Sequence, residues 1–210
     1  DLSFTVESGK IYGLLGENGA GKSTTMNIIT GCLAASEGEV IVNGHDIFEE
    51  PVAAKKCVGY LPEIPPVYTD MTVSEYLRFI AEAKDVPAKE RKAQLEEIFE
   101  STGLADVRGR LINNLSKGYR QRVGIAQALV GNPEIVILDE PTVGLDPKQI
   151  IEIRDLIRTL GRKHTVILSS HILSEVSAVC DSVMIIAHGK LVANGTPEEL
   201  TRLFAGDQEI

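Results

Sequence analysis

The chain has 210 residues, of which 43% are hydrophobic and 24% charged, an ordinary globular composition with a net charge of −9. This length suits one domain, or one domain with a small subdomain, and allows a sizeable core. The acidic balance argues against a nucleic-acid-binding protein, because neutralising phosphates requires clustered lysine and arginine.

Three cysteines, Cys32, Cys57 and Cys180, lie far apart and without metal-ligand spacing. They indicate reduced thiols that pack as small apolar side chains in a cytosolic protein. No apolar run reaches the ~18 residues that a membrane-spanning helix needs, so we expect any link to a membrane to come through a partner. The chain opens at Asp1 directly on a strand-like segment, and we expect it to be a fragment of a longer protein.

The first part of the chain alternates strand-like and helix-like patterns, which favours an α/β fold. Residues 2–6 and 10–16 predict two strands, and residues 21–31 predict a helix that ends at a glycine. Residues 38–44 predict a further strand, in which Asn43-Gly44 supplies turn chemistry.

A glycine-rich loop, Gly16-x-x-x-x-Gly21-Lys22-Ser23, joins the second strand to the first helix. Such glycines let backbone amides turn inward around a phosphate, and the helix start adds its positive end. Lys22 would place a charge at the β- and γ-oxygens, and the Ser23 hydroxyl would ligate Mg²⁺. The loop therefore predicts a nucleoside triphosphate site. The residues expected to bind the triphosphate are Asn18, Gly19, Ala20, Gly21, Lys22, Ser23 and Thr24.

The composition of the sequence changes near residue 70, where a charged, alanine-rich and helical pattern begins. Thr72 and Glu75 predict a capping box for one helix, and Pro87 fits the first turn of a second helix that runs to about Thr102. We interpret this segment as a small inserted helical subdomain. The prediction is one domain, with a P-loop α/β core of mostly parallel sheet at about 1–69 and 126–210, an antiparallel β part near the N-terminus, and a helical subdomain at about 70–125.

A second acidic element follows this insert, where the apolar strand in "EIVILDEPT" ends in Asp139-Glu140. Asp139 can hold the hydration shell of Mg²⁺. Glu140 is placed to orient or deprotonate a water for in-line attack on the γ-phosphate. The pair could instead cap the following turn, but a chain that also carries a P-loop favours hydrolysis.

The last third of the chain predicts further strands at 164–170 and 182–189, with helices between them and at the end. Asp146-Pro147 supplies a cap and a first position for one of these helices. Thr196, Pro197 and Glu199 repeat that pattern before the last helix. The residues expected to face the core at helical spacing are Ile150, Ile153, Ile157 and Leu160.

The order of "GLLGENGAGKST", "LSKGYRQR", "ILDEPTVGLD" and the histidine after "HTVILSS" resembles the ATP-binding domain of an ABC transporter over nearly the whole chain. The resemblance implies ATP and Mg²⁺ as ligands, and ATP hydrolysis coupled to transport. It also implies a head-to-tail pair with a second ATP-binding subunit, most simply a homodimer, and a transmembrane permease subunit as partner. The chain is most similar to ABC-2-type exporter subunits, including those linked to gliding motility. We therefore expect a cytoplasmic protein, peripheral on the inner face of the cell membrane.

The stretch "LSKGY" resembles the signature loop of this family, usually LSGGQ. The chain keeps Leu115, Ser116 and Gly118 but has Lys117 and Tyr119 in place of glycine and glutamine. In the family, each signature loop closes over the ATP held by the other subunit. A hydroxyl, a backbone amide and a helix start at this point would form a second anion site.

The resemblance assigns three further positions. His171 resembles the switch histidine that contacts the γ-phosphate, and Val143–Asp146 resembles the D-loop, with Asp146 reaching across the dimer. Glu63 takes the place of a glutamine that senses Mg²⁺ and links to the membrane domain. The expected sets are Lys22, Glu63, Glu140 and His171 for catalysis, Ser23, Glu63 and Asp139 for the metal, and Gly144, Leu145 and Asp146 for the D-loop.

The family also places an aromatic residue, which stacks on adenine, in a strand before the one that opens this chain. Phe4 and Tyr12 stand at the wrong positions for that role. From the phosphate contacts alone, we expect poor discrimination between ATP and GTP.

Two alternatives stay open at this point. A soluble ABC ATPase acting in translation or DNA repair would share these motifs, although such proteins tend to carry tandem ATPase domains or a long coiled-coil insertion. A P-loop kinase would share the phosphate loop, but no arginine-rich lid is evident and Ser116-x-Gly118 would be unexplained.

Overall fold

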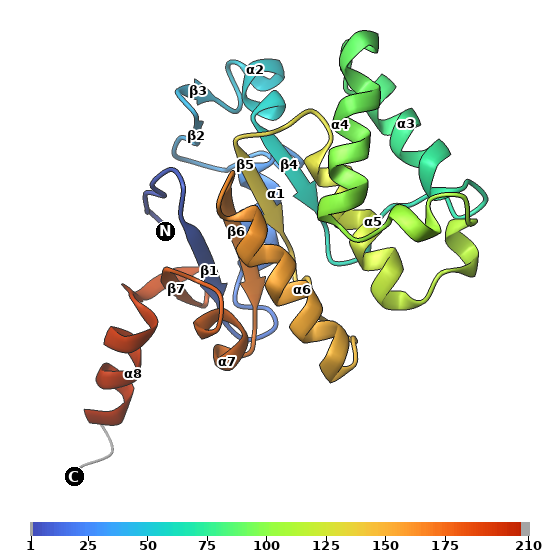
Figure 1. Cartoon of the computed structure of the whole chain (residues 1–210). Coiled ribbons are helices and arrows are strands. Elements are labelled where there is room, and N and C mark those ends of the chain that lie inside the picture. Colours follow the sequence, from blue (N-terminus) through green and yellow to red (C-terminus); the bar gives the residue numbers. More distant parts are fainter. Residues whose placement is uncertain (1, 207–210) are drawn as a thin grey trace.

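The computed structural model describes residues 2–206, which form a six-stranded sheet flanked by helices, with a group of helices at one side (Figure 1). The sheet has the order β4-β5-β6-β1-β7-β8, and its neighbours are parallel except for the antiparallel pair β7–β8. This arrangement confirms the predicted mostly parallel α/β fold. The strands are β1 Ile11–Leu15, β4 Val58–Leu61, β5 Ile135–Leu138, β6 Thr165–Ser170, β7 Ser182–Ala187 and β8 Lys190–Gly195.

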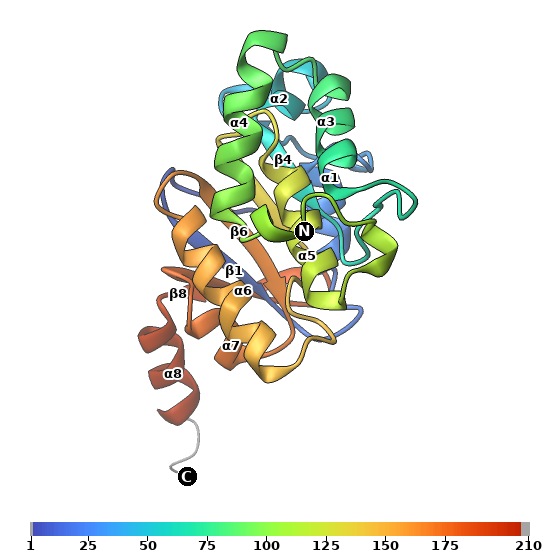
Figure 2. The same ribbon diagram turned by 45° about the vertical axis from the view of Figure 1, so that its right-hand side comes forward.

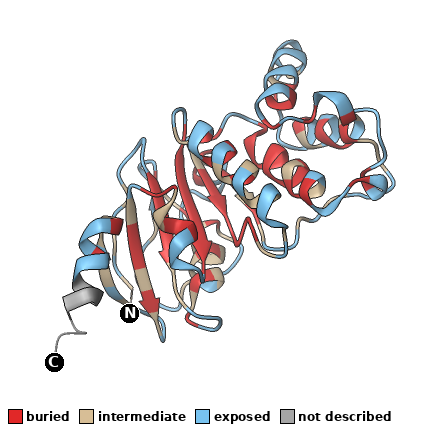
Figure 3. Ribbon diagram, turned by 60° about the horizontal axis from the view of Figure 1, so that its bottom comes forward, coloured by how far each residue is buried: buried red, intermediate tan, exposed pale blue. Residues whose placement is uncertain are grey.

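The central strands are buried on both faces, because helices cover the sheet from both sides (Figure 3). Successive strand residues point to opposite faces. Val136 and Leu138 of β5 pack in one core with Ile153 of α6 (Pro147–Leu160). Ile137 packs in the other core with Met26 of α1 (Lys22–Ile29). Burial on both faces explains the continuous apolar runs by which the sequence revealed these strands.

Three helices pack together at one side of the sheet, namely α3 (Val73–Ala83), α4 (Ala88–Ser101) and α5 (Lys117–Leu129) (Figure 2). Helix α5 also packs against β4, so its buried side chains belong to the same core as one face of the sheet. The predicted boundary near residue 125 falls inside α5, and the division into core and subdomain stays a prediction. The remaining elements are α2 Pro51–Lys56, α7 Leu173–Ser177, α8 Pro197–Gly206 and the 3₁₀ turns Ala105–Val107 and Ile112–Asn114.

The starts of α3 and α6 follow the predicted caps. Thr72 and Glu75 form the capping box of α3, in which the Glu75 N–H donates to Thr72 Oγ1 over 3.2 Å. Asp146 caps α6, whose first residue is Pro147. Pro87 lies at the N-cap of α4, one residue before the first turn in which it was expected. None of the helices within residues 2–206 has the length and apolar character that crossing a bilayer requires.

Two strand predictions near the N-terminus need correction. Residues 2–6 form no strand, although their apolar side chains are half-buried against the core, because this segment makes no backbone ladder. The predicted strand at 38–44 is reduced to β2 (Ile41–Val42), which pairs antiparallel with β3 (His45–Asp46) around Asn43-Gly44. Both turn residues have positive φ, 49° and 85°, as a tight hairpin turn requires.

The sequence also gave no indication of β8. This strand forms the edge of the sheet and has only half-buried and exposed residues. Its run contains asparagine and glycine, which weaken the usual strand pattern.

Candidate nucleotide-binding site

The glycine-rich loop lies between the end of β1 and the start of α1. A Cβ atom on Gly16 would collide with the carbonyl oxygen of Ile186, so only glycine fits there. Gly19 and Gly21 have φ values of 82° and 110°, which other residues adopt only with strain. Gly21 precedes α1, and no side-chain hydrogen bond caps this helix start. The first turn of α1 thus keeps backbone N–H groups for an anion.

Lys22 lies inside the loop, with only 5% of its surface exposed. Its Nζ donates to the carbonyl oxygens of Gly16 (2.8 Å) and Glu17 (3.2 Å) and lies 3.4 Å from Glu140 Oε1. A buried ammonium group needs such partners, because an unpaired buried charge is costly. These contacts fix the positively charged Lys22 ammonium group within the loop.

An open cavity of about 440 Å³ lies beside this loop. The residues that line it come from the loop and from positions after the carboxyl ends of β4, β5 and β6. Ligands of open parallel sheets usually bind at this edge. Apart from Ala20, which is buried, every residue predicted to bind the triphosphate lines the cavity, and so do all four predicted catalytic residues. The lining residues are Asn18, Gly19, Gly21, Lys22, Ser23, Thr24, Glu63, Glu140, Val143 and His171.

Glu140 lines the cavity together with the loop residues. Its backbone has φ 46°, a left-handed conformation that is rare outside glycine and that clusters at functional sites. Glu140 Oε2 lies 3.1 Å from His171 Nδ1. Glu140 Oε1 is buried and accepts no hydrogen bond from the described residues, although it faces Lys22 Nζ. This carboxylate oxygen therefore has the Lys22 ammonium group as its nearest charged neighbour and no hydrogen-bond donor among the described residues.

Asp139 lies behind Glu140 and does not line the cavity. Ser169 of β6 connects the two residues, since its hydroxyl donates to Asp139 Oδ1 (2.6 Å) and accepts the N–H of Glu140 (2.8 Å). Burial, and then the negative charge of Asp139, raise the pKa of Tyr60 to about 12. Sequence reasoning missed Ser169, for which the available signal was a serine pair at the end of a buried strand.

The donors at this edge of the sheet suit Mg²⁺. Ser23 and Glu63 line the cavity, and Asp139 lies just behind it. Within residues 2–206, no three side chains of His, Cys, Asp or Glu gather as a metal cluster. Mg²⁺ usually takes one or two carboxylates together with waters and substrate phosphates. The donor set therefore fits an ion that binds together with a nucleotide.

The predicted signature loop lies away from this cavity, and none of its residues lines it. Leu115 is buried, whereas Ser116, Lys117 and Tyr119 are exposed. The Ser116 hydroxyl caps α5 and accepts the N–H of Tyr119 over 3.4 Å. The structure does not bring this loop to the phosphate loop of the same chain.

The signature loop instead packs against the predicted D-loop. A Cβ on Gly118 would lie 2.8 Å from the Gln149 side chain, and a Cβ on Gly144 would collide with Lys117 Nζ. Gly144 has φ 67° and Leu145 is half-buried. Val143 at the start of the D-loop lines the nucleotide cavity, so this loop runs from the cavity to the signature loop.

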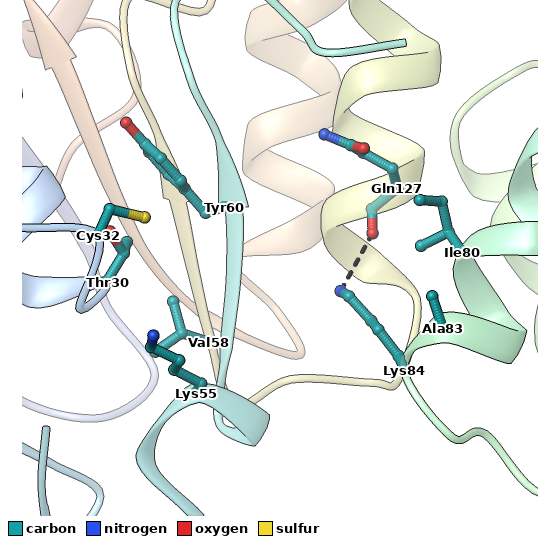
Figure 4. A pocket seen from close by; sticks show the side chains of 9 residues that line it. All are labelled: Thr30, Cys32, Lys55, Val58, Tyr60, Ile80, Ala83, Lys84 and Gln127. Carbon is teal, nitrogen blue, oxygen red and sulfur yellow. Dashed lines mark hydrogen bonds between the residues drawn. The ribbon is translucent and has the colours of Figure 1, made fainter. Parts of the chain in front are cut away.

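A second cavity of about 270 Å³ lies between the end of α1, strand β4 and helices α3 and α5 (Figure 4). Lys84, just after α3, donates from Nζ to the carbonyl oxygens of Gln127 (3.2 Å) and Val130 (2.8 Å) at the end of α5. Burial lowers the pKa of Lys84 to about 8. The residues that line this cavity are Thr30, Cys32, Lys55, Val58, Tyr60, Ile80, Ala83, Lys84 and Gln127.

Comparison with known proteins agrees with this geometry. The protein-family model for ABC transporters matches residues 1–143 of the chain. The lipopolysaccharide export system ATP-binding protein LptB of Haemophilus influenzae is 36% identical over 218 residues, which cover 99% of this chain and 90% of that protein. The solved structure of cbiO1 from Clostridium perfringens, part of the ABC transporter complex cbiONQ, has a TM-score of 0.87 at 28% identity and covers 95% of this chain and 82% of that one.

The chain belongs to the ABC transporter family and is an ATP-binding domain of the kind that hydrolyses ATP. This assignment excludes the P-loop kinase, and the relatives named as transporter components do not favour a soluble ATPase of translation or DNA repair. ABC transporter A family member 1 of Dictyostelium discoideum is 34% identical over 95% of this chain, yet the chain spans only 23% of that protein. Domains of this type thus occur both as nearly whole subunits and as parts of much longer chains.

Proposed function

We propose that this protein drives a membrane permease in export, through ATP-dependent formation of a head-to-tail homodimer and hydrolysis at Glu140. The observation that carries the proposal is the position of the Glu140 carboxylate in the cavity wall, with one oxygen 3.1 Å from His171 Nδ1 and the other 3.4 Å from Lys22 Nζ. The relative LptB is the ATP-binding protein of a lipopolysaccharide export system, which supports export as the direction of transport.

The chemistry follows from the residues at the cavity wall. Lys22 and the backbone N–H groups at the start of α1 bind the β- and γ-phosphates. The Glu140 carboxylate accepts the proton of an attacking water or holds that water in line, while His171 fixes the orientation of the carboxylate. Mg²⁺, held by Ser23 with Asp139 and Glu63 nearby, would neutralise charge on the phosphates.

The signature loop supplies the reason for a dimer. Its exposed Ser116 and the first turn of α5 form an anion site that this chain does not use for its own cavity. A second copy in head-to-tail orientation would bring Leu115–Tyr119 over the nucleotide of the first. Asp146 of the D-loop, which is exposed at the start of α6, would lie at the same interface.

We place the permease contact on the exposed apolar side chains that follow Glu63 in the chain. Ile64 directly follows Glu63 and is 82% exposed, and the exposed rings of Tyr68 and Phe79 pack together with 5.5 Å between their centroids. Neighbouring exposed apolar side chains of this kind mark protein interaction sites. A permease docked here would hold the protein on the cytoplasmic face of the membrane.

The test uses Glu140→Gln, which keeps the shape of the site but removes the base. We expect ATP turnover to fall by roughly 10²–10⁴-fold, and size-exclusion chromatography to show a dimer with ATP and a monomer with ADP. The matched control, Lys22→Ala combined with Glu140→Gln, should stay monomeric with ATP. Turnover at the parental rate, or no change in mass with ATP, would contradict the proposal.

A further inference from the structure

Glu175 is a buried carboxylate behind the nucleotide cavity for which the hydrolysis scheme gives no role. It lies in α7, is 8% exposed and does not line the cavity. Its Oε2 accepts two hydrogen bonds, from Thr142 Oγ1 at 2.6 Å and from Ser170 Oγ at 3.0 Å. One oxygen atom thus joins two segments that are 28 residues apart in the chain.

Both partners of Glu175 stand next to residues of the cavity wall. Thr142 lies two residues after Glu140, in a turn closed by a 3.1 Å hydrogen bond from the Val143 N–H to the Glu140 carbonyl. Ser170 directly precedes His171. The Glu175 carboxylate therefore links the segment that carries Glu140 to the segment that carries His171.

Ser170 has further bonds that fix this link. Its hydroxyl oxygen accepts the N–H of Ile172 (3.1 Å), so its hydrogen points to Glu175. Its carbonyl oxygen accepts the N–H of Gly16 (3.3 Å), which ties in the first residue of the phosphate loop. Three segments of the active site thus meet around one buried carboxylate.

Packing alone does not explain an acidic residue at this place. Burying a carboxylate is costly unless hydrogen bonds compensate, and an apolar side chain of similar volume would fill the space without that cost. The contact between Glu140 Oε2 and His171 Nδ1 is 3.1 Å long and joins an exposed ring to a strained backbone. Ser169 fixes Glu140 on the strand side, and Glu175 fixes both segments from behind.

We propose that Glu175 is a positioning residue for ATP hydrolysis, which holds Glu140 and His171 in register through Thr142 and Ser170. This inference rests on the proposed roles of Glu140 and His171. Because Glu175 does not touch the cavity, it acts on the turnover number and leaves ATP binding unchanged. A misplacement of about 1 Å at a reacting group can cost on the order of 100-fold in rate, so even a small shift is measurable.

The test compares variants that keep or remove the hydrogen-bond acceptor. Glu175→Leu should lower kcat about tenfold or more and leave the KM for ATP within about twofold. Glu175→Gln, which keeps an acceptor oxygen, should retain kcat within about threefold. Thr142→Val should lower kcat in the same direction, and adding it to Glu175→Leu should lower kcat no further, because both changes break one link. Thr159→Val, on the exposed side of α6, is the matched control.

Melting temperature and nucleotide affinity separate positioning from a merely structural role. The inference would be overturned if folded Glu175→Leu or Thr142→Val kept the parental kcat. It would also be overturned if Glu175→Gln lost as much kcat as Glu175→Leu. If Glu175→Leu does not fold, Thr142→Val and Ser170→Ala decide by the same criteria. The proposed function fails separately, by parental turnover of Glu140→Gln.

Discussion

Two helix starts were singled out by the sequence as anion sites, and their surroundings differ. At α1, no side chain caps the helix, Lys22 is buried in the loop, and Glu140 and His171 face the same cavity. At α5, the Ser116 hydroxyl caps its own helix, and the loop is exposed and lines no described cavity. The first site is built within one chain, whereas the second offers half of a site.

This difference shows why the signature loop is difficult to interpret from one chain. A helix start with a capping serine is common and needs no ligand. Its function depends on a surface that only another copy can bring. This half-site is also fixed to the D-loop and to α6, through contacts of Lys117 with Gly144 and of Gly118 with Gln149. The D-loop in turn begins at the nucleotide cavity.

Of the changes at the two helix starts, the largest effect should come from removing the charge at the complete site. Lys22→Ala should weaken ATP binding by roughly 10–100-fold, because hydrogen bonds to charged groups contribute about 1.5–3 kcal/mol each. Equilibrium titration with a fluorescent ATP analogue measures this loss. Lys148→Ala, at an exposed position of α6, is the matched control. An unchanged dissociation constant for ATP would show that the phosphate loop does not bind the nucleotide through Lys22.

The half-site should respond differently. Ser116→Arg puts a bulky cation on an exposed cap, so ATP binding by the monomer should stay within about threefold. Turnover should fall by about tenfold or more, because removing donors to developing charge has costs of this order. Ser101→Arg, at an exposed position in the last turn of α4, is the control. Equal damage to binding and turnover would mean that Ser116 acts within its own chain.

The smallest effect concerns the other end of α5, which Lys84 closes. Because the pKa of Lys84 is lowered to about 8 in the folded protein, the unfolded chain binds more protons between pH 8 and its ordinary value. The free energy of unfolding should therefore rise with pH in this window. Lys84→Met should lack this rise in urea unfolding experiments, and parallel pH profiles would show that Lys84 is not responsible.

The sequence predicted the phosphate loop, the caps of α3 and α6 and the buried strands β1, β5, β6 and β7, because each depends on residues close together in the chain, but it did not predict β4. The strand that it predicted at residues 2–6 does not form, because this segment pairs with no other strand. The sequence also missed the link of Thr142 and Ser170 to Glu175, and the contact of Lys117 with Gly144. The Thr142–Glu175 and Lys117–Gly144 contacts join segments far apart in the chain, for which no local pattern exists, whereas Ser170 and Glu175 are only 5 residues apart.

The central claim is that the half-site at α5 completes the cavity of a second copy. Lys22→Ala and Ser116→Arg damage opposite halves of one composite site, so a homodimer of either variant has two defective sites. A mixed dimer places both defects in one site and leaves the other intact.

The most direct measurement is therefore the ATPase activity of the two defective variants after mixing, with subunit exchange confirmed by labelled protein. The account predicts that activity returns in part and rises with total protein concentration. If subunits exchange and the mixture is no more active than its separate components, Ser116 does not act on the nucleotide of the neighbouring subunit.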